Sequence, residues 1–321
     1  MKNQSGNKFE RAIGTFIREC IKLKKHETTL IIANLKSITP ATALLNYTLT
    51  LTNNAYLVQI PELQKPGFLS PILRMLSEID VLIIACDMDF RYLESLNQQI
   101  DHNSRIIYFP YFNQSIRKKS IHVNYNKLKL MSNRLADIFS IGKNLELKSD
   151  GGTLLQLSIK KENGITLDGK MNEKGIFSIF PSGKAQVCPV SNSTNGTVVV
   201  DGSIQGVGQI TEEIKLNFRN GRLVRIFGNG QADLLRKFLK NKPFSTARDL
   251  IRIGVGTNHN AKVSGNPYED EVAYGRIHLG IGQFSQSSRR SNLLNYFRIT
   301  LRKAELSIDG RPVISNGKMM V

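Results

Sequence analysis

A single histidine, His278, lies in the run EVAYGRIHLGIGQF (271–284), where it could serve as a metal ligand or as a catalytic base. In this run apolar residues alternate with His278, Gly280 and Gly282, which predicts a strand with these three residues on one face. Glycines beside a histidine leave room for another group to approach the backbone. A core histidine that is hydrogen-bonded to its neighbours is the alternative interpretation. The segment by itself leaves both open.

Two other features could carry chemistry, and we disfavour both. Cys188, in AQVCPV, could act as a nucleophile paired with His278, but a cysteine in an apolar strand is usually inert. The glycine-rich phrases GVGQI and GVGTN lack the lysine-serine ending of a phosphate-binding loop. We therefore expect their glycines to serve turns or the close approach of strands.

The bulk composition is that of a globular chain with a substantial core. The chain has 321 residues, of which 40% are hydrophobic and 22% charged, and its length favours about two domains. No apolar run is long enough to span a bilayer, and the first residues lack the apolar core of a signal peptide. Three widely separated cysteines argue against a disulfide framework or a zinc knuckle. We expect a cytoplasmic protein.

The formal net charge of +18 is the most unusual bulk property. Such a charge attracts anionic partners, including nucleic acid, an acidic peptide or a membrane surface. The sequence contains no zinc finger and no RNA-binding signature with its aromatic residues. Nucleic-acid binding therefore stays an alternative that rests on charge alone.

The first half of the chain reads as alternating helices and buried strands. Helical spacing is present in FERAIGTFIRECIKL, LSPILRMLSEI and RYLESLNQQI, and ATALLNYTLTLT reads as a helix that leads into a strand. Continuous apolar strands are expected in TTLIIAN, DVLIIACD and RIIYFPYF. This alternation predicts a parallel sheet covered by helices on both faces. KLKLMSNRLADIFSIGKNL is then expected as a helix that leads out of this domain.

The second half has short alternating runs punctuated by glycine, asparagine and aspartate. RNGR and IDGR are expected as hairpin turns, because Asn-Gly and Asp-Gly tolerate positive φ. One helix, QADLLRKFLKN, interrupts the strands. We predict an α/β domain over residues 1–147 and a β-rich α+β domain over residues 148–321.

Seven phrases occur in an order that resembles one known family. They are GGTLLQLSI, IFPSGKAQVCPV, NGTVVVDGSI, NGRLVRI, RIGVGTN, DEVAYGRIHLGIG and LSIDGRPVISNGK. Together they resemble the aminopeptidase T type of leucyl aminopeptidase, whose superfamily includes the iron-dependent 2,5-dihydroxypyridine dioxygenases. The resemblance extends over essentially the whole chain and implies the aminopeptidase T-like fold.

The resemblance also implies a metal site, and most of its ligand positions are changed in this sequence. Lys184 and Arg252 stand where the relatives have two carboxylates, and His278 is kept. A histidine and an aspartate two residues apart in the relatives fall on Asn295 and Phe297. Divalent metals need deprotonated donors, which an ammonium and a guanidinium cannot supply. We therefore expect no metal and no other cofactor.

Exchanging two anionic ligands for two cations suggests an anion-binding pocket made by Lys184, Arg252, His278 and Asn295. Arginine binds a carboxylate or phosphate bidentately, and lysine acts as a mobile charge. Buried cations need counter-charges, for which the local candidates are Asp201, Asp270 and Glu271. The competing interpretation is decay, in which a lost site fills with whatever is tolerated.

Three functions remain open. The favoured one is a metal-free homologue that binds a peptide or another small anionic ligand in the former active-site cleft, as a helper in a pathway or a repurposed protein. The alternatives are a metal-independent enzyme of a modification or biosynthetic pathway, and a metallohydrolase with other ligands. By its residues the chain is not a functional metalloaminopeptidase. Because relatives of this kind are often oligomers, we expect a homodimer.

Overall fold

The computed structural model describes residues 10–62, 68–99, 104–115, 119–240, 246–283 and 296–320. The chain divides into two compact units, and each is described separately. Unit 1 comprises residues 1–125 and 169–181, and unit 2 comprises residues 126–168 and 182–321. The boundary therefore differs from the predicted one at residue 147, which falls inside a strand of unit 2.

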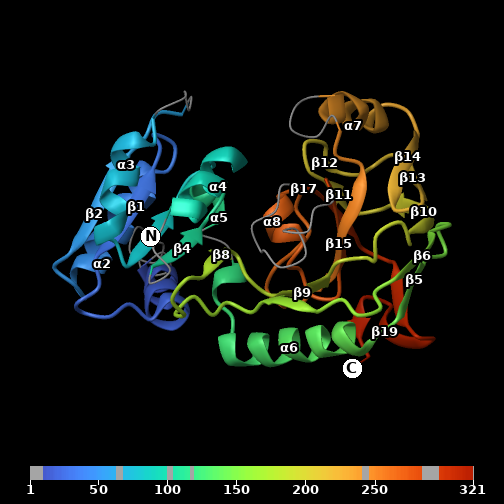
Figure 1. Ribbon diagram of the computed structural model, residues 1–321, viewed down its shortest axis with the longest axis horizontal. Coiled ribbons are helices and arrows are strands. Elements are labelled where there is room, and N and C mark those ends of the chain that lie inside the picture. Colours follow the sequence, from blue (N-terminus) through green and yellow to red (C-terminus); the bar gives the residue numbers. More distant parts are fainter. Residues whose placement is uncertain are drawn as a thin grey trace, which may run out of the picture. The chain divides into compact units, whose positions relative to one another are not determined.

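Unit 1 is built on a parallel sheet of five strands in the order β2-β1-β3-β4-β8 (Figure 1). Its strands are β1 (Thr29–Ala33), β2 (Ala55–Gln59), β3 (Val81–Ile84), β4 (Arg105–Tyr108) and β8 (Phe177–Ile179). Its helices are η1 (Phe16–Ile21), α2 (Ile38–Leu49), α3 (Ser70–Met75), η2 (Leu76–Glu78), α4 (Phe90–Gln99), α5 (Phe112–Ser115) and η3 (Lys119–Ile121). The predicted α/β architecture is confirmed for this unit.

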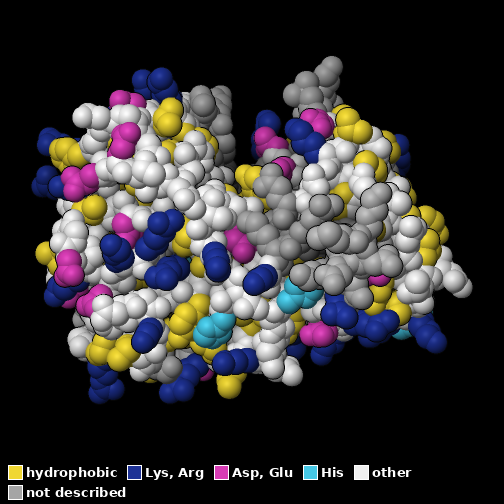
Figure 2. Space-filling view, turned by 180° about the vertical axis from the view of Figure 1, so that it is seen from behind, with side chains coloured by type: hydrophobic (Ala, Val, Ile, Leu, Met, Phe, Trp, Pro, Cys, Tyr) yellow, Lys and Arg dark blue, Asp and Glu magenta, His cyan; other side chains and the backbone are white. Residues whose placement is uncertain are grey.

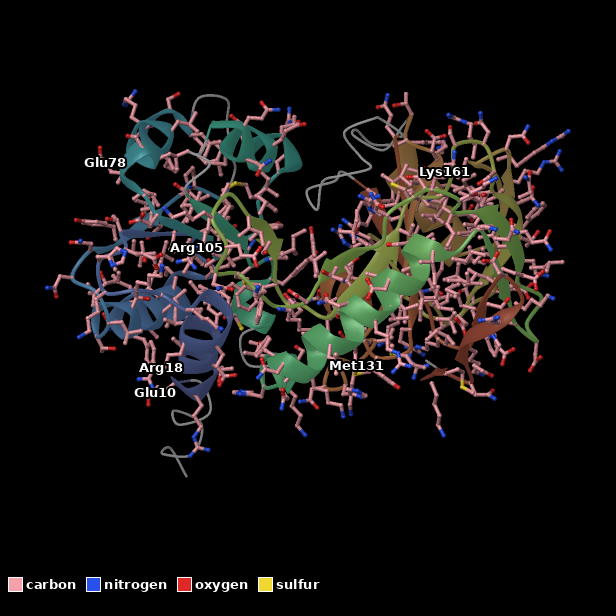
Figure 3. All side chains as sticks on the ribbon, turned by 60° about the horizontal axis from the view of Figure 1, so that its bottom comes forward. Glu10, Arg18, Glu78, Arg105, Met131 and Lys161 are labelled. Carbon is pink, nitrogen blue, oxygen red and sulfur yellow. The ribbon has the colours of Figure 1, made fainter. Side chains whose placement is uncertain are left out.

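Aromatic packing and one buried ion pair stabilise unit 1. The ring of Phe180 lies 4.9 Å from that of Phe16 and 4.7 Å from that of Phe109. Arg105, labelled in Figure 3, is buried, and its Nη2 lies 2.7 Å from Oε2 of Glu27. Its Nη1 donates to two backbone carbonyls, so the buried guanidinium is well satisfied.

Two details of unit 1 differ from the sequence-based expectation. The segment expected to turn from helix to strand within residues 41–52 stays helical to Leu49, and the strand begins later, at Ala55. Strand β8 joins the edge of the sheet beside β4 after a long excursion of the chain through unit 2. A three-residue strand carries too little periodicity to be recognised from sequence.

Unit 2 is dominated by antiparallel pairing, and its described residues contain one sheet of fifteen strands. The strands are β5 (Asn144–Lys148), β6 (Leu154–Ser158), β7 (Ile165–Leu167), β9 (Lys184–Val187), β10 (Asn195–Val200), β11 (Ser203–Ile204), β12 (Gly208–Gln209), β13 (Ile214–Arg219), β14 (Arg222–Phe227), β15 (Asp249–Gly256), β16 (Ile277–Gly282), β17 (Tyr296–Leu301), β18 (Glu305–Ile308), β19 (Arg311–Ser315) and β20 (Lys318–Met319). Three helices accompany them: α6 (Tyr125–Ile141, of which residues 126–141 lie in this unit), α7 (Gln231–Lys240) and α8 (Pro267–Asp270).

The two predicted hairpin turns are confirmed. Asn220 and Gly221 join β13 to β14 with φ values of 49° and 80°. Asp309 and Gly310 join β18 to β19 with φ values of 49° and 77°. Positive φ at both central residues matches the right-handed twist of the flanking strands, which is why these dipeptides are favoured there.

The core of unit 2 lies on the apolar face of its central strands. Ile253, Leu279 and Ile299 are neighbours across β15, β16 and β17, and all three are fully buried. Helix α6, on which Figure 3 labels Met131, adds Leu135 and Phe139 to this core. The opposite face of the same strands is polar, and it carries the candidate site.

The surface reflects the basic composition. Figure 2 shows Lys and Arg side chains spread over both units on the face drawn. Within the described part of the chain, no helix combines the length and the apolar character needed to cross a membrane.

Candidate functional site

Four adjacent strands of unit 2 present polar side chains on one buried face. Strand β15 pairs with β9 on one side and β16 on the other, and β16 pairs with β17. The pairing aligns Gln186, Gly254, His278 and Thr300 in one row across the four strands. Because side chains alternate between faces of a strand, the polar residues of the neighbouring rows share this face. They are Lys184 on β9, Cys188 directly after this strand, Arg252 on β15, and Tyr296 and Arg298 on β17.

Two glycines form the floor of this face. A Cβ atom at Gly254 would lie 2.6 Å from Cε1 of His278 and 2.7 Å from Cβ of Gln186. A Cβ atom at Gly280 would lie 2.7 Å from the ring of Tyr296. The missing side chains thus let the histidine, the glutamine and the tyrosine lean over the strands, as the glycines beside His278 had suggested.

A buried ion-pair network lies above this floor. Nζ of Lys184 lies 2.8 Å from Oε1 of Glu271, which directly follows the short helix α8. Nε of Arg298 lies 3.2 Å from Oε2 of the same carboxylate. The hydroxyl of Tyr296 accepts a hydrogen bond from Lys184 at 3.3 Å and donates one to Glu271 at 3.4 Å. Two cations therefore share one carboxylate, and all these side chains are at least 95% buried.

Aromatic rings hold the guanidinium of Arg298 in place. Its Cζ lies 4.1 Å from the ring centre of Tyr268 and 4.4 Å from that of Tyr296. Cation–π contacts of this kind are strongest where water is excluded. Tyr268 belongs to α8, which packs against β17 and β11 (Figure 1), so this helix brings both Tyr268 and Glu271 to the site.

The network perturbs the titration of its members. Burial favours the neutral form of the Glu271 carboxyl, but the charges of Lys184 and Arg298 outweigh burial and lower its pKa to about 2. Burial and the charge of Lys184 lower the pKa of His278 to about 3, so the imidazole is neutral at pH 7. For Arg298, burial opposes ionisation, yet Tyr268 and Glu271 raise its pKa above the usual range.

One polar atom of the central row, Oε1 of Gln186, has no hydrogen-bond partner among the described residues. The neighbouring imidazole of His278 interacts with the backbone of Glu271. Both side chains are about 99% buried and both lie over Gly254. Buried polar groups are nearly always hydrogen-bonded, so this row has the capacity to bind a polar group.

Arg252 shares the polar face but makes a different contact. A register shift between Leu250 and Arg252 separates the part of β15 that pairs with β14 from the part that pairs with β9. Nη1 of Arg252 contacts Sγ of Cys188 and also donates to the carbonyl of Ile251. The thiol of Cys188 donates to that same carbonyl at 3.3 Å.

Comparison with known proteins identifies the family. Residues 69–321 match the family described as NicX: 2,5-dihydroxypyridine 5,6-dioxygenase. The chain belongs to this family.

Two solved structures share the fold of this family member. The first is the 2,5-dihydroxypyridine dioxygenase from Pseudomonas putida KT2440, with a TM-score of 0.78 and 17% identity over 100% of this chain and 98% of that one. The second is wild-type AmpT from Thermus thermophilus, with a TM-score of 0.69 and 12% identity over 98% of this chain and 100% of that one. A comparison with curated protein sequences gave no match. The predicted superfamily and two-part fold are thus confirmed.

Within this family fold, the predicted site residues divide into three groups. Lys184 and His278 lie together with Glu271, while Arg252 lies on the same face and turns toward Cys188. Asn295 lies outside the described residues. Two of the three suggested counter-charges have other roles.

Asp201 and Asp270 both accept hydrogen bonds from backbone N–H groups. Asp201 accepts hydrogen bonds from the backbone N–H groups of Arg302 and Lys303. Asp270 accepts from the backbone N–H groups of Ser264 and Gly265 and from the hydroxyl of Ser203. Short acidic side chains are well suited to such turns.

Sequence reasoning missed Gln186, Tyr296 and Arg298. The alignment with the relatives gave Asn295 and Phe297 as the changed ligand pair, but Phe297 packs on the apolar face, in the core. In YFRITL the alternate residues Tyr296, Arg298 and Thr300 are the ones that face the site. This period-two pattern was the available signal, because residues two apart in a strand share a face.

The metal centre that the resemblance implies does not fit these residues. The described residues contain no group of three or more His, Cys, Asp and Glu side chains placed to hold a metal ion. Glu271 is held by Lys184 and Arg298, whose charges would repel a dication. His278 can offer a nitrogen lone pair, but one imidazole falls short of the three protein ligands of a catalytic site.

Proposed function

We propose that this family member has no metal centre and instead binds a peptide or another small anionic ligand on the polar face of β9, β15, β16 and β17. The observation that carries the proposal is the shared carboxylate: Lys184 and Arg298 both pair with Glu271, which leaves one positive charge in excess within this buried trio. An excess buried charge is costly and is relieved by an anion.

The trio of Lys184, Arg298 and Glu271 carries one positive charge more than its carboxylate balances. A bound carboxylate or phosphate would supply the negative charge through charge-assisted hydrogen bonds.

The two similar structures are named as a dioxygenase and as AmpT, and neither name defines the activity of this chain. Both relatives are less than 20% identical to this chain, so the likeness concerns the fold. A function is carried by the residues of a site, and Lys184 and Arg298 make this site cationic. Binding is therefore the role that its chemistry favours.

Calorimetric titration with sodium acetate tests the proposal, using wild type, Lys184→Met and the control Lys215→Met. Lys215 also pairs with a glutamate, Glu213, but at the surface of β13. Losing one of two charge-assisted contacts should weaken binding by about ten- to hundredfold in Lys184→Met and leave Lys215→Met unchanged. No binding to wild type, or equal affinity in all three folded proteins, would reject the proposal.

A further inference from the structure

An unpartnered acceptor beside Lys184 indicates more than a negative charge in the ligand. Oε1 of Gln186 can only accept hydrogen bonds, and it has no donor among the described residues. The row therefore offers one unused acceptor, at Gln186.

The charged part of the site adds a donor next to this row. The ammonium group of Lys184 contacts Oε1 of Glu271 and the hydroxyl of Tyr296, which accounts for two of its three N–H bonds. Lys184 and Gln186 are two residues apart on β9 and point to the same face. A positive donor thus lies beside a neutral acceptor.

We infer that the site recognises a carboxylate with a neighbouring N–H group, as in an N-acylated amino acid or the carboxyl end of a peptide. This inference rests on the proposed function and narrows its ligand. The carboxylate would pair with Lys184 and Arg298, and the N–H group would donate to Oε1 of Gln186. Sulfate, which only accepts hydrogen bonds, would leave Oε1 of Gln186 buried without a donor, at a cost in affinity.

Two glycines fix the acceptor of Gln186 in place. Gly254 lies between Gln186 and His278 in the row, and Gly280 lies between Arg252 and Arg298 in the next row. The side chains of Gln186 and His278 fill the space over Gly254, where a Cβ atom would lie 2.7 Å from Cβ of Gln186. The acceptor is therefore positioned by packing before a ligand arrives.

The test compares two probes on the same protein, N-acetylglycine and N-acetylsarcosine, which differ by the N-methyl group that removes the N–H donor. Wild type should bind N-acetylglycine about tenfold more tightly, the value of one hydrogen bond to a buried acceptor. In Gln186→Leu, which removes the acceptor at similar volume, the ratio should fall toward one.

The outcomes separate this inference from the function on which it rests. Equal affinity of wild type for the two probes, with both bound, overturns the inference and leaves anion binding intact. An unchanged ratio in Gln186→Leu also overturns it, because the N-methyl group would then act by size. Failure of acetate and both probes to bind wild type overturns the proposed function as well. The wild-type comparison needs no variant, so it stands even where Gln186→Leu does not fold.

Discussion

Nζ of Lys184 lies 2.8 Å from Oε1 of Glu271, and both side chains are about 99% buried. A lysine has taken a position that the resemblance assigns to a metal-binding carboxylate, and it is held by a carboxylate from a different part of the chain. This relationship gives the site an internal cation. The stability, titration and chemistry of unit 2 should reflect it.

The free energy of unfolding should depend strongly on Glu271. Glu271→Gln leaves Lys184 and Arg298 buried without their counter-charge, so we expect a loss of about 3–5 kcal/mol. Lys184→Met leaves the pair of Glu271 with Arg298 and should cost less. Urea denaturation measures both, with Lys215→Met as the surface control, for which a change below about 1 kcal/mol is expected. Similar losses for Glu271→Gln and the control would contradict the network.

Stability should decline as the pH falls below about 6.5, partly because of His278. Its pKa is about 3 in the folded chain and near 6.5 when unfolded, so the unfolded state binds the extra proton between these values. One such proton corresponds to about 1.4 kcal/mol per pH unit. Above pH 6.5 His278 costs the folded state no stability, and the free energy of unfolding falls progressively as the pH is lowered from 6.5 toward 3.

Glu271 adds to the same trend at lower pH. Its pKa is lowered to about 2, so its stabilisation is present above pH 4.5 and is lost as the pH falls toward 2. Denaturation curves of wild type and His278→Gln at pH values from 5 to 6.5 isolate the histidine. The variant should show a flatter dependence on pH, and identical slopes would contradict a buried neutral imidazole.

The floor of the site should not accept a side chain at Gly254. A Cβ atom there would lie 2.3 Å from the backbone oxygen of Ala185, which cannot move freely. We expect Gly254→Ala to destabilise the protein by about 1–3 kcal/mol or more, as overpacking does. Gly151→Ala is the control, because its nearest atom is Oγ of Ser149 at 3.7 Å. Thermal denaturation of the two variants should separate them clearly, and equal melting temperatures would rule out the crowded floor.

Hydrolysis of leucyl and other aminoacyl reporter substrates should be absent, with or without added divalent ions. His278 has a pKa of about 3 and is a weak general base, and Lys184 holds the place of a metal ligand that would help to activate water. Turnover that ignores chelators would favour a metal-independent enzyme. Turnover that chelators abolish would favour a metallohydrolase with other ligands.

Local patterns in the sequence predicted much of the architecture of the site strand. The alternation around His278 placed it correctly on one face with Gly280 and Gly282, because side-chain direction in a strand depends only on neighbouring residues. The Asn-Gly and Asp-Gly turns were predictable for the same local reason. The same rule applied to YFRITL would have brought Tyr296 and Arg298 to the polar face.

The partner of Lys184 was not predictable from local pattern. Glu271 directly follows α8, which lies on the long connection between β15 and β16. Its distance from Lys184 is set by the packing of that helix on β17. The sequence suggested three acidic candidates, and only the tertiary structure separates Glu271 from Asp201 and Asp270. The membership of residues 169–181 in unit 1 is equally non-local, because it depends on the pairing of β8 with β4.

The metal content of the purified protein tests the central claim most directly, that an internal ion pair stands in the position of the metal centre. Wild type is incubated in turn with iron(II), zinc and manganese, desalted, and measured by elemental analysis beside His278→Ala. The account predicts far less than one metal ion per chain, equal in the two proteins, because Lys184 and Arg298 occupy the carboxylate of Glu271. About one metal ion per chain in wild type, lost in His278→Ala, would contradict it.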